Sequence, residues 1–162
     1  MKQTNNIIRK TLNQSKKLAL MVALFLTVGI SYSFAASGDE LNNDIRTSFQ
    51  KDFKGAHIIN TEVKKAFTRL TFTMNDVVFS AFYAENGELL AVTRNILSTQ
   101  LPVNLQINLK NNYSGYWITE LFELSGNDQS CYYVSLENAD SKLTLRSIDG
   151  SNWEVYEKSA KN

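Results

Sequence analysis

The chain has 162 residues, with 17 basic and 16 acidic residues, one histidine and one cysteine. It contains no basic run that could hold a phosphate backbone, so nucleic-acid binding is not expected. The single cysteine, Cys131, excludes an intramolecular disulfide. In an exported chain it is either buried or paired with another chain, and its strand-like setting favours burial.

The first 35 residues have the form of an export signal. Basic residues precede an apolar run over residues 18–30, and Ser33-Phe34-Ala35 has the small-x-small pattern that signal peptidase reads. The run is too short to cross ~30 Å of hydrocarbon comfortably, and no second run follows. Cleavage would leave about 127 residues with 12 basic and 16 acidic side chains, a net charge of −4. We expect a periplasmic or secreted protein with no membrane span after cleavage; a retained N-terminal anchor is the alternative.

The remaining chain repeats itself at an offset of 60 residues. In each copy, apolar residues step by four along a helix, a glycine follows, and an apolar residue begins a strand. The matched positions are Leu41, Ile45, Phe49, Phe53, Gly55 and Ile58 in the first copy, and Leu101, Leu105, Leu109, Tyr113, Gly115 and Ile118 in the second. The domain prediction is a signal peptide over residues 1–35 and two repeats, 36–97 and 98–162.

The first repeat predicts one helix and four strands. The helix begins near Leu41, with Asp39 as a candidate cap, runs for about 14 residues, and stops at Gly55. Asn75-Asp76 and residues 85–87 (Glu-Asn-Gly) predict hairpin turns between strands. The predicted strands are His57–Lys65, Phe67–Met74, Val77–Ala84 and Glu88–Ile96.

The second repeat begins at Leu101-Pro102, where the only proline suits a first helical residue. Residues 103–109 alternate as a strand does, but residues 101–113 also step by four as a helix does. The correspondence with the first repeat favours the helix. The predicted strands are Tyr116–Leu124, Gln129–Glu137, Ser141–Ile148 and Asn152–Lys158.

Spaced aromatic and glycine motifs extend over residues 40–158. They are Phe49-x3-Phe53-x-Gly55-Ala56, Thr71-Phe72, Tyr83-x2-Asn86-Gly87-Glu88-Leu89, Leu101-Pro102, Tyr113-x-Gly115-Tyr116 and Tyr132-x-Val134. With them the chain resembles the exported PepSY-like family, whose members are similar to the beta-lactamase inhibitory protein. The resemblance implies an α+β fold in which two tandem α-β4 repeats form a continuous, curved antiparallel sheet of about eight strands, with the helices on one face. It also implies protein binding through the other face, although this chain has none of the disulfides of the inhibitory protein.

Residues that carry catalysis are scarce. His57 is the only histidine and has no evident partner, and one histidine with one cysteine makes no zinc set. Glu120 and Glu123 would point to opposite faces of one strand. The sequence therefore predicts no enzyme activity, no metal and no cofactor; a hydrolase with an unrecognised site is the remaining enzymatic alternative.

One face of the predicted sheet has the composition of a binding surface. If Leu70, Ile118, Val134, Leu143 and Leu145 point to the helices, their neighbours point away from them. Trp, Tyr and Arg are enriched where proteins bind one another, although aromatic residues and threonine are also favoured in any strand. The predicted partner-binding residues are Arg69, Thr71, Trp117, Thr119, Tyr133, Thr144 and Arg146.

Two functions follow from these observations. The first is an exported, non-enzymatic module that binds or modulates another envelope or extracellular protein. The alternative is a carrier that holds a small ligand or peptide between the sheet and the helices, suggested by the supply of 9 Phe, 7 Tyr and 2 Trp. Those aromatic residues are equally suited to an ordinary core.

Overall fold

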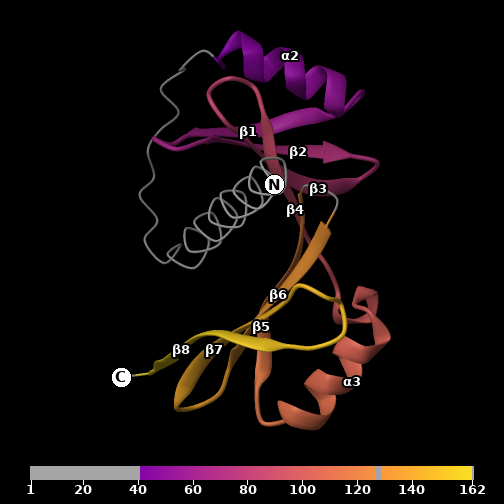
Figure 1. Cartoon of the computed structure of the whole chain (residues 1–162), viewed down its shortest axis with the longest axis vertical. Coiled ribbons are helices and arrows are strands. Elements are labelled where there is room, and N and C mark those ends of the chain that lie inside the picture. The colour runs from indigo at the N-terminus through magenta and orange to yellow at the C-terminus, as the bar shows by residue number, and fades with distance from the viewer. Residues whose placement is uncertain (1–40, 127–128, 162) are drawn as a thin grey trace, which may run out of the picture. The chain divides into compact units, whose positions relative to one another are not determined.

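Each half of the described chain is one helix followed by four strands (Figure 1). The structure is a computed structural model that describes residues 41–126 and 129–161; the predicted signal peptide and Asp39 lie outside these residues. The first half comprises α2 (Asn43–Asp52), β1 (His57–Val63), β2 (Thr68–Met74), β3 (Val77–Tyr83) and β4 (Leu89–Asn95). A 3-10 turn, η1 (Ser98–Gln100), leads to α3 (Val103–Asn112), β5 (Trp117–Gly126), β6 (Gln129–Glu137), β7 (Ser141–Ser147) and β8 (Glu154–Ala160).

Capping residues mark the ends of both helices. Asn42 caps α2, its side-chain oxygen accepting a hydrogen bond from the Asp44 amide at 2.8 Å, and Gly55 follows the helix at a φ of +80°. The helix has 10 residues and not about 14, because Asn42 caps it after the predicted start at Leu41 and the chain leaves the helix at Phe53. Pro102, predicted as the first helical residue, is instead the N-cap of α3, and the helix begins one residue later at Val103.

The second helix is confirmed by the exposure of its residues. Leu105 and Leu109 are buried, whereas Ile107, between them in sequence, is 52% exposed. On a strand all three would share one face; on a helix Ile107 lies on the opposite side. The correspondence with the first repeat therefore predicted this segment correctly.

The eight strands form one antiparallel sheet in sequence order. The β1–β2 register shifts between Ile58 and Asn60, and the β5–β6 register shifts between Ile118 and Glu120, 60 residues later. The two repeats thus share a bulge as well as an order of elements. Strand ends differ from the predicted ones by up to two residues.

The two halves join through β4 and β5. Val92–Asn95 pairs with Phe122–Ser125, and across this joint Arg94 Nε donates to Glu123 Oε2 at 2.8 Å. Immediately after β4, the Ile96 amide donates to the Leu121 carbonyl at 3.1 Å. Backbone pairing therefore makes the sheet continuous from one repeat to the next.

The strand register places both helices on the same face. Residues paired across antiparallel strands point to one side, and so do alternate residues along a strand. Ala81, in the cluster under α2, pairs with Val92, which pairs with Ser125; two alternations along β5 then reach Leu121, in the cluster under α3. We call this side the helix face and the other side the opposite face.

Two side-chain clusters fill the helix face. Under α2 the buried residues are Ile45, Phe49, Leu70, Phe72, Ala81 and Tyr83. Under α3 they are Ile96, Leu101, Leu105, Leu109, Leu121, Val134, Leu136, Leu143 and Leu145. Leu70, Val134, Leu143 and Leu145 lie where the alternation predicts, but Ile118, on the same face, is 43% exposed because it lies among the exposed first residues of β5.

Candidate partner-binding face

The register brings six of the seven predicted residues to the opposite face. On β2, Arg69 and Thr71 alternate with buried Leu70 and Phe72. In the second half, Tyr133 pairs with Arg146, Thr144 pairs with Ser135, and Trp117 pairs with Glu137. Thr119, the seventh, lies in the β5 bulge, and its hydroxyl donates to the Ser135 carbonyl at 3.2 Å.

An apolar strip crosses the middle of this face. Its members lie on β3 to β6 and belong to neither cluster under the helices; Phe82 pairs with Ala91, Phe122 with Tyr133 and Leu124 with Cys131. Each is less than 5% exposed, so the strip is buried and not a solvated surface. It consists of Phe82, Ala91, Phe122, Leu124, Cys131 and Tyr133.

Tyr133 is the centre of an aromatic group in this strip. Its ring stacks on Phe122, with centroids 5.2 Å apart, and meets Tyr156 edge-on at 5.8 Å. The Arg146 guanidinium lies 5.5 Å from the centre of the Tyr156 ring. Burial is the main cause that raises the pKa of Tyr133 to about 12. Tyr133 is therefore a packed residue, 2% exposed, and Thr144 is also buried.

Matching ion pairs lie toward both edges of the face. Arg69 on β2 pairs with Glu62 on edge strand β1, and Arg146 on β7 pairs with Glu154 on edge strand β8, with 3.1 Å between Nη2 and Oε2. Both arginines are half-buried, and the Nε atom of each is buried without a hydrogen-bond partner in the structure.

Trp117 is the exposed aromatic residue among the predicted seven. Its side chain is 53% exposed, and Lys161 Nζ lies 5.1 Å from the centre of its ring. Glu137 pairs with Trp117 by register, and its carboxylate forms ion pairs with Lys142 Nζ at 2.8 Å and Lys161 Nζ at 2.6 Å. These two lysines hold the pKa of Glu137 below its ordinary value. The pattern of alternation identified Trp117, but its lysine neighbour near the C-terminus carried no sequence signal.

Cys131 lies in the apolar strip and is 3% exposed, as its strand-like setting predicts. Burial raises the pKa of its thiol, which reduces the thiolate fraction at neutral pH. Of the two alternatives for Cys131, the structure therefore supports burial and not a disulfide with another chain.

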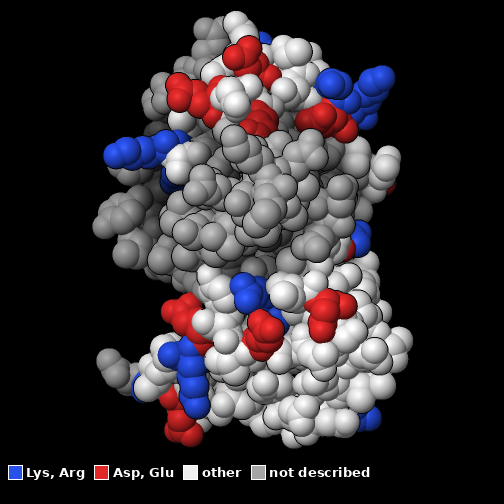
Figure 2. All heavy atoms as spheres, in the orientation of Figure 1, with Lys and Arg blue, Asp and Glu red and all other residues white. Residues whose placement is uncertain are grey.

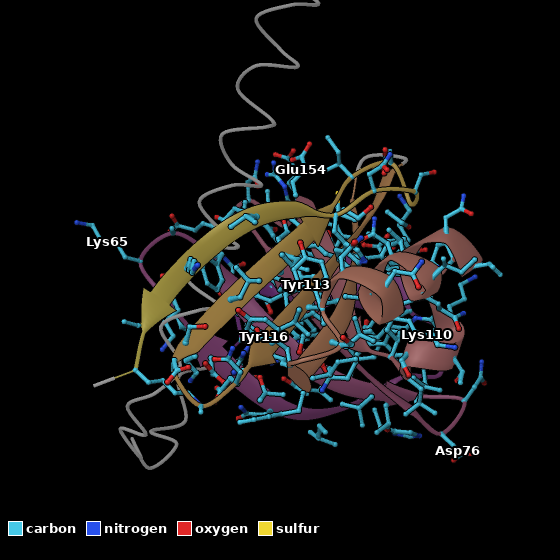
Figure 3. The ribbon with its side chains drawn as sticks, turned by 90° about the horizontal axis from the view of Figure 1, so that it is seen from below. Lys65, Asp76, Lys110, Tyr113, Tyr116 and Glu154 are labelled. Carbon is cyan, nitrogen blue, oxygen red and sulfur yellow. The ribbon has the colours of Figure 1, made fainter. Side chains whose placement is uncertain are left out.

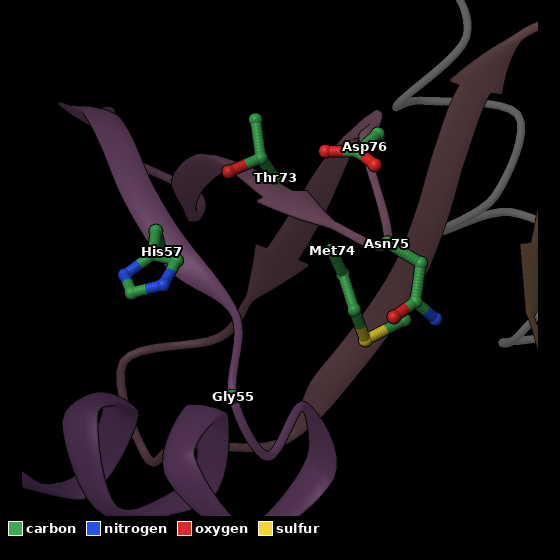
Figure 4. Close-up of a pocket in the computed structure, with 6 residues that line it drawn as sticks. All are labelled: Gly55, His57, Thr73, Met74, Asn75 and Asp76. Carbon is green, nitrogen blue, oxygen red and sulfur yellow. The ribbon is translucent and has the colours of Figure 1, made fainter.

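A shallow depression near His57 does not assemble a catalytic group. It has a volume of about 430 Å³ and is lined by Gly55, His57, Thr73, Met74, Asn75 and Asp76. In Figure 4 the His57 ring and the Asp76 carboxylate come from different sides of the depression and do not point toward one another. Within residues 41–126 and 129–161, no group of three His, Cys, Asp or Glu side chains could hold a metal ion.

Solved structures share this fold at low sequence identity. A DUF2874 family protein from Bacteroides ovatus superimposes with a TM-score of 0.66 at 12% identity, over 76% of this chain and 89% of its own. A BLIP-like protein from Bacteroides fragilis, BLIP being the beta-lactamase inhibitory protein, gives 0.62 at 15% identity, over 72% and 84%. A Bacteroides eggerthii protein, described by inference as periplasmic, gives 0.62 at 12% identity, over 73% and 87%. No family model and no curated protein matches the chain.

These similarities establish the fold that the sequence predicted, including its likeness to a BLIP-like protein. Among the described residues, no helix is long and apolar enough to cross a membrane.

Proposed function

We propose that this chain is an exported, non-enzymatic binding module of the PepSY-like type, which binds another protein of the cell envelope through the opposite face of its sheet. The predicted signal peptide and the inferred periplasmic location of a structural neighbour support export. The BLIP-like neighbour supports protein binding as the use of this fold.

One observation carries the proposal: the opposite face presents the exposed Trp117 and the half-buried Arg69 and Arg146 around the apolar strip. Each half already has a complete core under its own helix, so the strip is not needed to hold the helices to the sheet. Because each residue of the strip is less than 5% exposed, the contact area available to a partner comes from the side chains around the strip and not from the strip itself. Aromatic and arginine side chains at its margins are the types that contribute most to protein interfaces.

The polar margin gives the interface its selectivity. Arg146 and Arg69 present partly exposed guanidinium groups, and Trp117 offers an exposed aromatic ring. Because truncation of one partner in a desolvated ion pair costs more than loss of an exposed contact, the arginines should matter most if a partner excludes water from them. The packed clusters between helices and sheet do not favour the carrier alternative.

Capture of a partner from envelope extract tests the proposal. The test variant combines Trp117→Ala with Arg146→Gln, and leaves the buried Tyr133 intact. The matched control combines Arg46→Gln with Thr47→Ala on the exposed side of α2, on the helix face of the sheet. We expect the test variant to lose a partner that both the wild type and the control retain, with melting temperatures nearly equal in all three. Equal capture by the test variant would contradict the proposal.

A further inference from the structure

The outer side of α3 carries aliphatic side chains that are largely exposed and belong to neither core cluster. Val103 is 67% exposed and Ile107 is 52% exposed. Ile107 follows Val103 by one helical turn, about 40° around the axis, so the two lie side by side. Leu105 and Leu109 occupy the other side of α3 and are buried against the sheet.

The first repeat provides an internal control for these residues. At an offset of 60 positions, Val103 and Ile107 correspond to Asn43 and Thr47, which are exposed on α2. The fold therefore accepts polar residues at both sites. Helix propensity does not explain the aliphatic pair either, because Val and Ile are weaker helix formers than Ala, Lys or Gln on an exposed face.

The surroundings of the pair are uncharged. Lys110 is the only charged residue in α3, whereas α2 contains Asp44, Arg46, Lys51 and Asp52. The surface over α3 is correspondingly mostly uncharged in Figure 2, while acidic and basic side chains gather over α2. This surface therefore favours a partner surface that is also neutral and partly aliphatic.

From this neutrality we propose that the outer side of α3 binds α3 of a second copy of the chain. A two-fold contact places like groups against like, which is unfavourable for charged patches but not for aliphatic residues and amides. Asn104 and Asn111, exposed on the same side, can both donate and accept and so can pair with their own copies.

Lys110 does not oppose this arrangement. It lies toward the C-terminal end of α3, on the side away from the strands (Figure 3). In antiparallel helices related by a two-fold axis near Leu105, the two Lys110 residues would be about 15 Å apart along the axis. Repulsion over that distance is largely screened, because the Debye length at physiological salt is about 8 Å.

The small size of the surface makes the dimer weak. A helix of 10 residues is about 15 Å long, so one helix pair buries much less than the ~800 Å² per partner of a standard interface. The contact lies on the helix side of the sheet, so both opposite faces remain available. A dimer would then present two partner sites and bind a multivalent partner with avidity.

Sedimentation velocity of the exported protein, from about 10 µM to about 1 mM, tests this proposal. We expect the mean mass to rise reversibly toward that of a dimer. The variant V103N/I107T carries the residues found at the equivalent positions of α2, and it should remain monomeric with an unchanged melting temperature. Ile107→Asp should also remain monomeric. Thr47→Asp on α2 is the control and should dimerise as the wild type does.

Two results would overturn the proposal: a wild-type monomer throughout the concentration range, or association that V103N/I107T leaves intact. Neither depends on capture of a partner by the opposite face. The capture experiment can therefore contradict the proposed function without affecting the dimer, and the sedimentation experiment can contradict the dimer without affecting the proposed function.

Discussion

The two halves of the molecule reach one architecture with different side chains. The cluster under α2 is largely aromatic: Phe72 lies 5.0 Å from Phe49 and 4.6 Å from Phe53, between ring centroids. The cluster under α3 is aliphatic, and the Trp153 indole at its margin donates to the Leu105 carbonyl at 3.1 Å. The positions of apolar residues, and not their identities, are what the halves share, as expected when pattern and volume decide a fold.

The halves also differ where they meet. β1 ends at Val63, whereas β5, its counterpart, continues past the equivalent Glu123 to Gly126. β4 pairs with residues 122–125, which include part of this extension. A longer strand in the second repeat thus provides the edge on which the first repeat continues the sheet.

Truncating the equivalent core residues should give the largest effects. Phe49→Ala should lower the free energy of unfolding by ~3–5 kcal/mol, and Leu109→Ala by ~2–4 kcal/mol. Phe49 is 3% exposed and contacts two other rings, whereas Leu109 is 9% exposed, so the first loss should be the greater. Urea denaturation measures both. A loss below about 1 kcal/mol at either position would contradict equivalent roles in the two cores.

Two glycines with positive φ should differ in their response to alanine. Gly55, at φ +80°, has nothing within 4 Å of an added Cβ, so Gly55→Ala should cost only the ~1–2 kcal/mol of left-handed strain. At Gly87, φ +77°, the added carbon would lie 2.8 Å from the Asp44 carbonyl oxygen on α2. Gly87→Ala should therefore cost more. Thermal denaturation measures both variants. Equal losses of melting temperature in Gly55→Ala and Gly87→Ala would indicate that α2 does not contact the β3–β4 turn.

Asp149 should make the stability of the β7–β8 loop depend on pH. Hydrogen bonds from the Asn152 amide at 2.9 Å and the Ser151 amide at 2.8 Å hold its pKa well below the ordinary value. A lowered folded-state pKa stabilises the fold above the unfolded-state pKa, and this stabilisation is lost as the pH falls below about 4.

Asp149→Ala should therefore melt below the wild type at pH 7, and the gap should narrow between about pH 4 and pH 2. Asp149→Asn, which keeps an acceptor oxygen, is the matched control and should lose less at pH 7. A gap that does not change with pH would show that the ionised carboxylate is not responsible.

The Arg94–Glu123 pair at the joint should contribute least. The side chains are 39% and 17% exposed, and exposed pairs usually contribute less than about 1 kcal/mol. A double-mutant cycle with Arg94→Gln and Glu123→Gln measures the coupling energy. A coupling above about 2 kcal/mol would mean that the ion pair, more than the backbone pairing, holds the repeats together.

Local patterns were enough to predict most of the fold. The offset of 60 residues identified α3 despite the strand-like alternation of Val103, Leu105 and Ile107. Alternation also predicted that Arg69, Trp117 and Arg146 point away from the helices, as the register shows. Long-range packing was not predictable in this way. The burial of Tyr133 depends on Phe122 and Tyr156 from other strands, and alternation along β6 carries no information about them.

The bulge at Thr119 shows a second limit. The bulge interrupts the alternation of side chains between Ile118 and Glu120. Counting alternate residues along the sequence therefore does not show on which face of the sheet Thr119 lies. The equivalent bulge in β1 shows that this irregularity belongs to both repeats.

Site-specific photocrosslinking in the cell envelope is the sharpest test of the proposed binding face, because it reports which side of the sheet touches a partner. A photoreactive residue at position 117 probes the opposite face, and one at position 47 probes the exposed side of α2. We expect a protein adduct from position 117 and none from position 47. An adduct from position 47 alone would contradict the proposed binding face.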